Sequence, residues 1–120
     1  MKLRTPRRGG YTLVEIMIVV AIIGLLVAVA VPNFVRARNT AQKNTCINNL
    51  RQIDGAKHQW ALENKMTDTG SPDSAQVGEY LRGGKFPSCP TRGIYTIGEI
   101  TNYPACTLAT SYGHILPRSY

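Results

Sequence analysis

The chain has 120 residues, which leaves room for one small folded domain beside a long apolar segment. Lys and Arg number 14 against 7 Asp and Glu, giving a net charge of +7. Four of the bases lie in the first ten residues, so residues 11–120 carry ten bases, seven acids and a net charge of +3. The high positive charge is therefore concentrated at the N-terminus and does not by itself indicate a nucleic-acid-binding protein.

The segment from Tyr11 to Pro32 is almost wholly apolar. No polar side chain occurs between Ile16 and Val31, and Glu15 is the one charged residue of the segment. As an α-helix, Tyr11–Val31 would be about 31 Å long, which matches the hydrocarbon thickness of a bilayer. The pattern predicts a helix that spans a membrane, assembles with other helices, or does both in turn.

A cleaved secretory signal is the alternative interpretation of this segment, with a small-residue cleavage site at Ala28-Val29-Ala30. Two features weigh against it. The apolar run is longer than the usual core of about 7–15 residues in such a signal, and a carboxylate near its start has no use there. The sequence therefore favours a helix that stays in the mature protein.

Glu15 invites two interpretations, because a charge inside a membrane segment costs on the order of 2–3 kcal/mol and usually has a partner. In the first, Glu15 lies one turn from the start of the helix and reaches the interface near Arg7 and Arg8. In the second, a cut after Gly10 gives Tyr11 a free α-amino group, which is positive at neutral pH. That ammonium could pair with Glu15 of a neighbouring chain and favour one axial stagger in a helix bundle.

The order Arg8-Gly9-Gly10-Tyr11-Thr12-Leu13-Val14-Glu15, followed by an apolar run and Pro32, resembles the N-terminus of type IV pilins and type II secretion pseudopilins. The resemblance implies that a prepilin peptidase cuts between Gly10 and Tyr11 and that the new N-terminus, Tyr11, is N-methylated. It also implies that Glu15 meets the amino group of a neighbouring subunit. Tyr11 departs from the phenylalanine most frequent at this position but is also aromatic.

By this resemblance the protein is a structural filament subunit rather than an enzyme, and no cofactor is expected. It would wait in the bacterial inner membrane as a single-pass prepilin with its head in the periplasm, and then enter a periplasmic or cell-surface filament. The implied partners are further copies or related pilin subunits, the prepilin peptidase and an inner-membrane assembly platform. The acidic calcium loop of major secretion pseudopilins is not expected, because Cys106–Tyr120 contains no acidic residue.

The helical pattern continues beyond the apolar segment to about Asn64. Pro32 lacks an N–H and clashes with the preceding turn, so it is predicted to kink the helix rather than end it. Gly24 is either an ordinary transmembrane glycine or a flexible point beside that kink. Apolar or small residues then recur three or four positions apart and predict an amphipathic helix: Phe34, Ala37, Ala41, Ile47, Leu50, Ile53, Ala56 and Trp60.

A small α+β head is predicted to follow. Ser71-Pro72 predicts the start of a short helix over Asp73–Arg82, which Gly83-Gly84 would stop. Two β-branched and aromatic stretches, Gly93–Gly98 and Ala105–Leu108, predict a hairpin or small three-stranded antiparallel sheet. This sheet would cover the apolar face of the helix, with Trp60 as a core residue between them; the tail, Ala109–Tyr120, has no clear pattern.

The predicted organisation is a leader (residues 1–10), a transmembrane or assembly helix (residues 11–31), the amphipathic half of the same long helix (residues 32–64) and a head (residues 65–120). The predicted class is therefore α+β, with a long N-terminal helix packed against a small antiparallel sheet.

The three cysteines permit one disulfide and leave one thiol over. A Cys89–Cys106 bond would close a loop of about 18 residues and stabilise the small head by about 3 kcal/mol. Cys46 is interpreted as a small buried apolar residue. A zinc site using Cys46 with His58 or His114 is the alternative; since no C-x-x-C or H-x-x-x-H spacing occurs, no metal site is predicted and neither histidine is given a chemical role.

A binding module is the rival function, in which a membrane-anchored or filament-tip protein captures DNA or another acidic ligand. Nucleic-acid binding of this kind usually sets several aromatic side chains beside exposed bases. The aromatic residues of the helical stretch, Phe34 and Trp60, lie on its apolar side, so the sequence disfavours this function. The bases that would carry it are Arg36, Arg38, Lys43 and Arg51.

Overall fold

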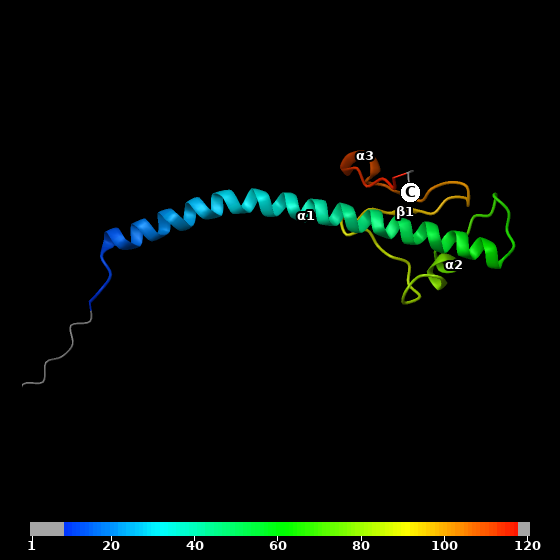
Figure 1. The fold of residues 1–120 in the computed structure, drawn as a ribbon, viewed down its shortest axis with the longest axis horizontal. Coiled ribbons are helices and arrows are strands. Elements are labelled where there is room, and N and C mark those ends of the chain that lie inside the picture. Colours follow the sequence, from blue (N-terminus) through cyan, green and yellow to red (C-terminus); the bar gives the residue numbers. More distant parts are fainter. Residues whose placement is uncertain (1–8, 118–120) are drawn as a thin grey trace, which may run out of the picture. The chain divides into compact units, whose positions relative to one another are not determined.

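The computed structural model describes residues 9–117, so most of the predicted leader, including Arg7 and Arg8, lies outside the described residues. The elements in chain order are α1 (Leu13–Glu63), α2 (Ser74–Glu79), β1 (Tyr95–Thr96), β2 (Ala105–Cys106) and α3 (Ala109–Tyr112) (Figure 1). The predicted α+β class with a long N-terminal helix and a small antiparallel sheet is confirmed. The chain forms two units, whose boundary lies inside α1 between Ala37 and Arg38.

The first unit consists mainly of the apolar part of α1. Its large side chains are exposed throughout, from Leu13 to Val31, and none of the residues described before Cys46 is buried. By length and composition α1 could cross a membrane, and no other helix within residues 9–117 could. A helix suits this apolar sequence because it satisfies its own backbone hydrogen bonds without water. Pro32 lies inside α1, as expected of a proline that does not end the helix; the kink near Gly24 and Pro32 stays a prediction.

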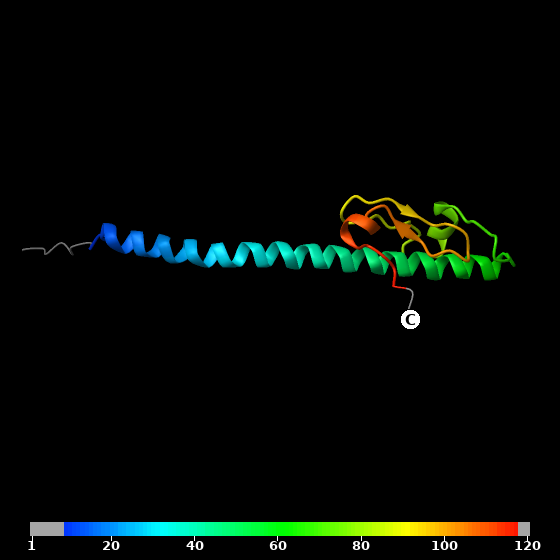
Figure 2. The same ribbon diagram turned by 90° about the horizontal axis from the view of Figure 1, so that it is seen from above.

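The second unit contains the rest of α1 and all of the smaller elements, which lie along one side of this part of the helix (Figure 2). Phe34, Ala37 and Ala41 of the predicted apolar face are exposed. From Leu50 to Trp60 the predicted amphipathic pattern is confirmed, because the buried residues of α1 recur three or four positions apart. These residues are Cys46, Leu50, Ile53, Ala56, Lys57, Trp60 and Ala61.

The end of α1 is closed by its own backbone. Lys65 adopts a left-handed conformation with φ of 51°, and the Met66 N–H donates to the Ala61 carbonyl at 3.0 Å. The Lys65 N–H donates to the Leu62 carbonyl at 3.4 Å, which completes the reciprocal pattern of a Schellman motif. The chain therefore turns back along α1 directly after Glu63.

Helix α2 is shorter than the predicted Asp73–Arg82, and Asp73 caps it instead of Ser71. The Asp73 Oδ1 accepts the Gln76 N–H at 2.8 Å, and the Gln76 Oε1 accepts the Asp73 N–H at 3.0 Å. This capping box fixes the start of the helix. The Tyr80 hydroxyl donates to Glu63 Oε2 at 2.6 Å and links the end of α2 to the end of α1.

The sheet has two strands, and a third is absent from the described residues. Strands β1 and β2 are antiparallel, with Tyr95 opposite Cys106 and Thr96 opposite Ala105. They are shorter than predicted because the carbonyls that follow β1 bind a lysine of α1 instead of another strand. The tail contains the four-residue helix α3, which ends at Gly113 with φ of 66°.

Two clusters of buried side chains hold the head against α1. The first contains Cys46 and Leu50 of α1 with Cys89, Cys106 and Leu116. The second contains Ile53, Ala56 and Val77, with Phe86, Tyr95 and Ile97 packed against it. Trp60 is buried as predicted, and a Cβ added at Gly70 would lie 3.3 Å from its ring, so the segment after α1 packs closely on it.

Candidate functional site

The predicted cleavage point lies in open chain just ahead of α1. Gly9 to Thr12 are outside the helix and exposed, and Tyr11 is 87% exposed. A Cβ added at Gly9 or Gly10 would meet no atom of residues 9–117 within 4 Å. The peptide bond between Gly10 and Tyr11 is therefore accessible to an enzyme that binds an unfolded stretch of chain.

Glu15 forms a capping box with Thr12 at the start of α1. The Thr12 N–H donates to Glu15 Oε2 at 3.0 Å, and the Glu15 N–H donates to Thr12 Oγ1 at 3.3 Å. Reciprocal bonds of this kind satisfy two N–H groups that a helix start leaves unpaired. Sequence reasoning missed the role of Thr12, although the T-x-x-E spacing before an apolar run is its usual signal.

The Glu15 carboxylate can accept further hydrogen bonds besides the one in the capping box. Glu15 is exposed and forms no ion pair within residues 9–117. A carboxylate offers about four acceptor positions, so the bond from the Thr12 N–H leaves room for a further cation. Tyr11 and Glu15 lie at the same end of α1, which the ion-pair interpretation of Glu15 requires.

A second group of candidate residues lies in the head, where four side chains from four separate segments meet. Cys46 comes from α1, Cys89 from the chain before β1, Cys106 from β2, and His114 follows α3. The Cys89 Sγ lies 3.7 Å from the Cys46 Sγ, 3.9 Å from the Cys106 Sγ and 3.8 Å from the His114 Nδ1. All four residues are buried, and their ligand atoms lie within 4.8 Å of one another. We call this group the thiol–imidazole cluster.

The cluster differs from what the sequence led us to expect. The predicted disulfide partners, Cys89 and Cys106, are neighbours whose sulfur atoms lie 3.9 Å apart without a bond, and the disulfide between them stays a prediction. Cys46 and His114, which were given no chemical role, belong to the same cluster. His58 does not, because it is exposed and its Nδ1 is 2.8 Å from the Asp54 carbonyl oxygen. No short motif joins positions 46, 89, 106 and 114, so only the fold reveals the group.

The three sulfur atoms have different surroundings. Burial raises the pKa of the Cys46 thiol to about 12. Burial also acts to raise the pKa of Cys89, but hydrogen bonds from Thr91, the Gly93 N–H and His114 outweigh it and lower that pKa to about 6. The turn around Cys89 therefore favours a thiolate at this one position.

Gly93 lets the backbone approach these sulfur atoms. A Cβ at this position would lie 2.6 Å from the Cys106 Sγ and 3.2 Å from the Cys89 Sγ. The first distance is closer than van der Waals contact allows, so any side chain here would displace the cluster.

Lys57 is a buried cation that sequence reasoning also missed. Its side chain is fully buried, and its Nζ donates to the carbonyls of Ile97 at 3.4 Å and Glu99 at 3.0 Å and to that of Asn102. Asp54 Oδ1 lies 3.8 Å away. Burial lowers the pKa of Lys57, and the nearby Asp54 carboxylate partly offsets that effect. The available signal was its position between Ala56 and Trp60 on the apolar stripe.

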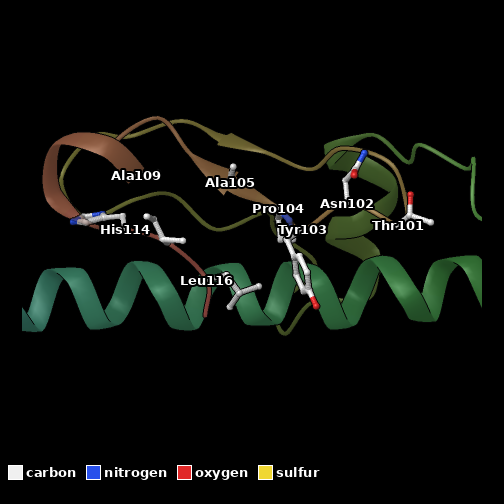
Figure 3. A pocket seen from close by; sticks show the side chains of 9 residues that line it. Thr101, Asn102, Tyr103, Pro104, Ala105, Ala109, His114 and Leu116 are labelled. Carbon is white, nitrogen blue, oxygen red and sulfur yellow. The ribbon is translucent and has the colours of Figure 1, made fainter. Parts of the chain in front are cut away.

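A hollow in the head offers no set of catalytic groups. It has a volume of about 490 Å³ and lies between the segment that leads into β2 and the segment after α3 (Figure 3). Among residues 9–117, its lining includes His114 and Tyr103 but no carboxylate, lysine or arginine. These residues do not provide a nucleophile, a base and an orienting group as a set.

The four bases of the rival binding function are all exposed: Arg36, Arg38, Lys43 and Arg51. The exposed ring of Tyr112 lines a shallow hollow together with Lys43. One aromatic ring beside one base falls short of the stacking platform that single-stranded nucleic acids need. The structure adds no strong support for that function.

Comparison with known proteins gives matches that centre on the N-terminal segment. Residues 5–31 match the family described as the prokaryotic N-terminal methylation motif. The chain is 41% identical to the type IV major pilin protein PilA of Myxococcus xanthus over 58 residues, which are 48% of this chain and 26% of that protein. It is 33% identical to the type II secretion system core protein G of Klebsiella pneumoniae over 63 residues, 52% of this chain and 45% of that protein.

A longer alignment joins the chain to the type II secretion system core protein G of Aeromonas hydrophila. The two are 29% identical over 104 residues, which cover 74% of this chain and 71% of that protein. The chain spans less than half the length of the Myxococcus and Klebsiella relatives. No solved structure matches it. Its methylation motif, exposed apolar helix and small α+β head make the chain similar to type IV pilins and type II secretion pseudopilins.

Proposed function

We propose that the protein is a structural subunit of a type IV pilus-like or type II secretion-like filament, processed by a prepilin peptidase and assembled through α1. The observation that carries the proposal is the order of parts at the N-terminus. An accessible Gly10–Tyr11 bond is followed within one turn by Glu15 and then by an apolar helix exposed on all sides. The motif match over residues 5–31 and the named relatives support the same order of events.

The exposed apolar side chains of α1 would be buried in two environments, one before assembly and one after it. Before assembly, lipid would surround it in the inner membrane, with the head on the periplasmic side. After cleavage and methylation of Tyr11, the same side chains would pack against α1 of neighbouring subunits. The partners of this proposal are further copies or related pilins, the prepilin peptidase and the inner-membrane assembly platform.

Glu15 would set the axial position of each subunit in the filament. Apolar helices in lipid discriminate weakly between one stagger and the next, because dispersion contacts are similar in each. A carboxylate buried with a neighbour's Tyr11 ammonium discriminates strongly, since a wrong stagger leaves two unpaired ions at a cost of several kcal/mol. The thiol–imidazole cluster plays no part in this step.

The processing step gives a direct test. The mass of the mature protein is expected to equal Tyr11–Tyr120 plus one methyl group. Gly10→Val is expected to block cleavage. Gly9→Ala serves as the control, because a Cβ added at either position meets no described atom within 4 Å. A mature chain that begins at Val31 would instead show cleavage by ordinary signal peptidase and overturn the proposal.

A further inference from the structure

We propose that the thiol–imidazole cluster binds one zinc ion through the sulfur atoms of Cys46, Cys89 and Cys106 and a ring nitrogen of His114. A tetrahedral zinc ion with Zn–S bonds of about 2.3 Å holds its sulfur ligands about 3.8 Å apart. The Cys89 Sγ lies 3.7 Å from the Cys46 Sγ and 3.9 Å from the Cys106 Sγ. The four ligand atoms thus lie close to the spacing that one ion between them requires.

The types of ligand select the kind of ion. Thiolate and imidazole ligands suit zinc and related transition metals, whereas calcium and magnesium need oxygen ligands. The cluster contains three sulfur ligands, one nitrogen ligand and no carboxylate. Four protein ligands fill a tetrahedral shell and leave no position for water, which is the arrangement of a structural site rather than a catalytic one.

The surroundings of Cys89 also suit a metal ligand. The Thr91 Oγ1 lies 3.2 Å from the Cys89 Sγ, and the N–H groups of Thr91 and Gly93 point at the same sulfur atom. Outer contacts of this kind orient a metal-binding sulfur. Gly93 contributes in a second way, because the absence of a Cβ leaves the space that the Cys106 sulfur occupies.

A disulfide accounts for fewer of these observations. A Cys89–Cys106 bond would use two sulfur atoms. The Cys46 thiol and the buried His114 imidazole would then have no role. The Cys89 and Cys106 sulfur atoms would also have to move from 3.9 Å apart to a bond of about 2.05 Å. One ion uses all four side chains with smaller movements.

The ion would fasten the head to α1. Its ligands come from α1, the turn before β1, β2 and the segment after α3. The sheet itself pairs only β1 with β2 and has two residues in each strand. Small domains with little core often depend on such a staple. Removal of the ion is therefore expected to loosen the hairpin and the C-terminal segment together.

The test uses the full-length chain purified in detergent without added reductant or chelator. Elemental analysis is expected to give about one zinc ion per chain. Replacing zinc by Co²⁺ is expected to produce the visible absorption of a tetrahedral cobalt–thiolate centre. His114→Gln, which removes one ligand, and Thr91→Val, which removes an outer hydroxyl, are expected to weaken metal binding by at least about tenfold.

His58→Gln is the matched control, since His58 is exposed on α1 and outside the cluster. It is expected to retain one zinc ion per chain. If His114→Gln or Thr91→Val fails to accumulate, the Co²⁺ titration of the unaltered chain still decides the question. A purified chain with a Cys89–Cys106 disulfide, or one with three free thiols and no bound metal, would overturn the proposal. The filament function is measured separately through cleavage and assembly, so neither result depends on the other.

Discussion

Some local structure in the head depends on single residues and is not predicted by the spacing of apolar residues. Lys57 is the clearest example. Burying an ammonium group costs several kcal/mol unless its donors are satisfied. Here three backbone carbonyls and the Asp54 carboxylate surround it. The buried charge therefore fixes the chain after β1 in place of further strand pairing.

Lys57→Met is expected to destabilise the head by about 3 kcal/mol, because it leaves the carbonyls around Ile97, Glu99 and Asn102 without their donor. Arg51→Met is the control, since Arg51 is exposed on the same helix and its loss is expected to change stability by less than about 0.5 kcal/mol. Thermal unfolding of the full chain in detergent, followed by circular dichroism, measures both. Equal melting temperatures for the two variants would show that the buried ammonium contributes nothing.

Glu15 can be tested in a way that separates its cap from its proposed ion pair. Glu15→Val is expected to insert and be cleaved normally but to give few filaments, and Glu15→Gln is expected to be intermediate because an amide still accepts a hydrogen bond. Thr12→Val removes the hydroxyl of the capping box but keeps the carboxylate, so it is expected to assemble. The measurements are the membrane level, the cleaved fraction and the yield of sheared filaments.

Two results would contradict the ion-pair mechanism. Normal filaments from Glu15→Val at wild-type expression would show that the charge is dispensable. An equal loss of filaments in Thr12→Val and Glu15→Val would show that the cap, and not the charge, is what assembly needs.

At the scale of elements, the sequence predicted helices better than strands. The period of α1 is local, and the spacing of Leu50, Ile53 and Trp60 was enough to identify its buried face. The strands are shorter than predicted because Lys57, distant in sequence, takes the carbonyls that follow β1. The position of the α2 cap was wrong by two residues, since the Asp73–Gln76 box outcompetes Ser71.

The turn between Cys89 and β1 gives an element-scale prediction. Gly93→Ala is expected to destabilise the head by about 1–3 kcal/mol, because its Cβ would lie 2.6 Å from the Cys106 Sγ. Gly55→Ala, the same substitution on α1, meets no atom within 4 Å and is expected to stabilise the helix by up to about 1 kcal/mol. Opposite shifts in melting temperature are expected, and a stabilising effect of Gly93→Ala would contradict the close approach.

At the scale of the molecule, the N-terminal segment could be predicted from the sequence and the thiol–imidazole cluster could not. Gly10, Tyr11 and Glu15, whose roles are proposals, lie within a short contiguous stretch, so their order is visible in the printed sequence. Cys46 and His114 come together only after the chain has folded back along α1, and no spacing rule connects them. Family resemblance did not help either, because it is strongest at the N-terminus.

The division into two units predicts that residues 38–120 fold without the apolar segment. All buried residues among those described lie at or after Cys46, and the boundary of the units precedes them. A chain without residues 1–37 is therefore expected to be monomeric and folded without detergent, as measured by size-exclusion chromatography and circular dichroism. A chain that begins at Gly55 loses Cys46, Leu50 and Ile53 and is expected to unfold. Failure of the longer fragment to fold would show that the head depends on the apolar half of α1.

The brevity of β1 and β2 has a consequence for crowding. An exposed sheet edge is a template on which a strand from another molecule can pair, and such pairing leads to aggregation. With two residues in each strand, this head offers almost no edge of that kind. Many copies could therefore lie side by side at high local concentration without strand pairing between their sheets. Association would then occur through the helices.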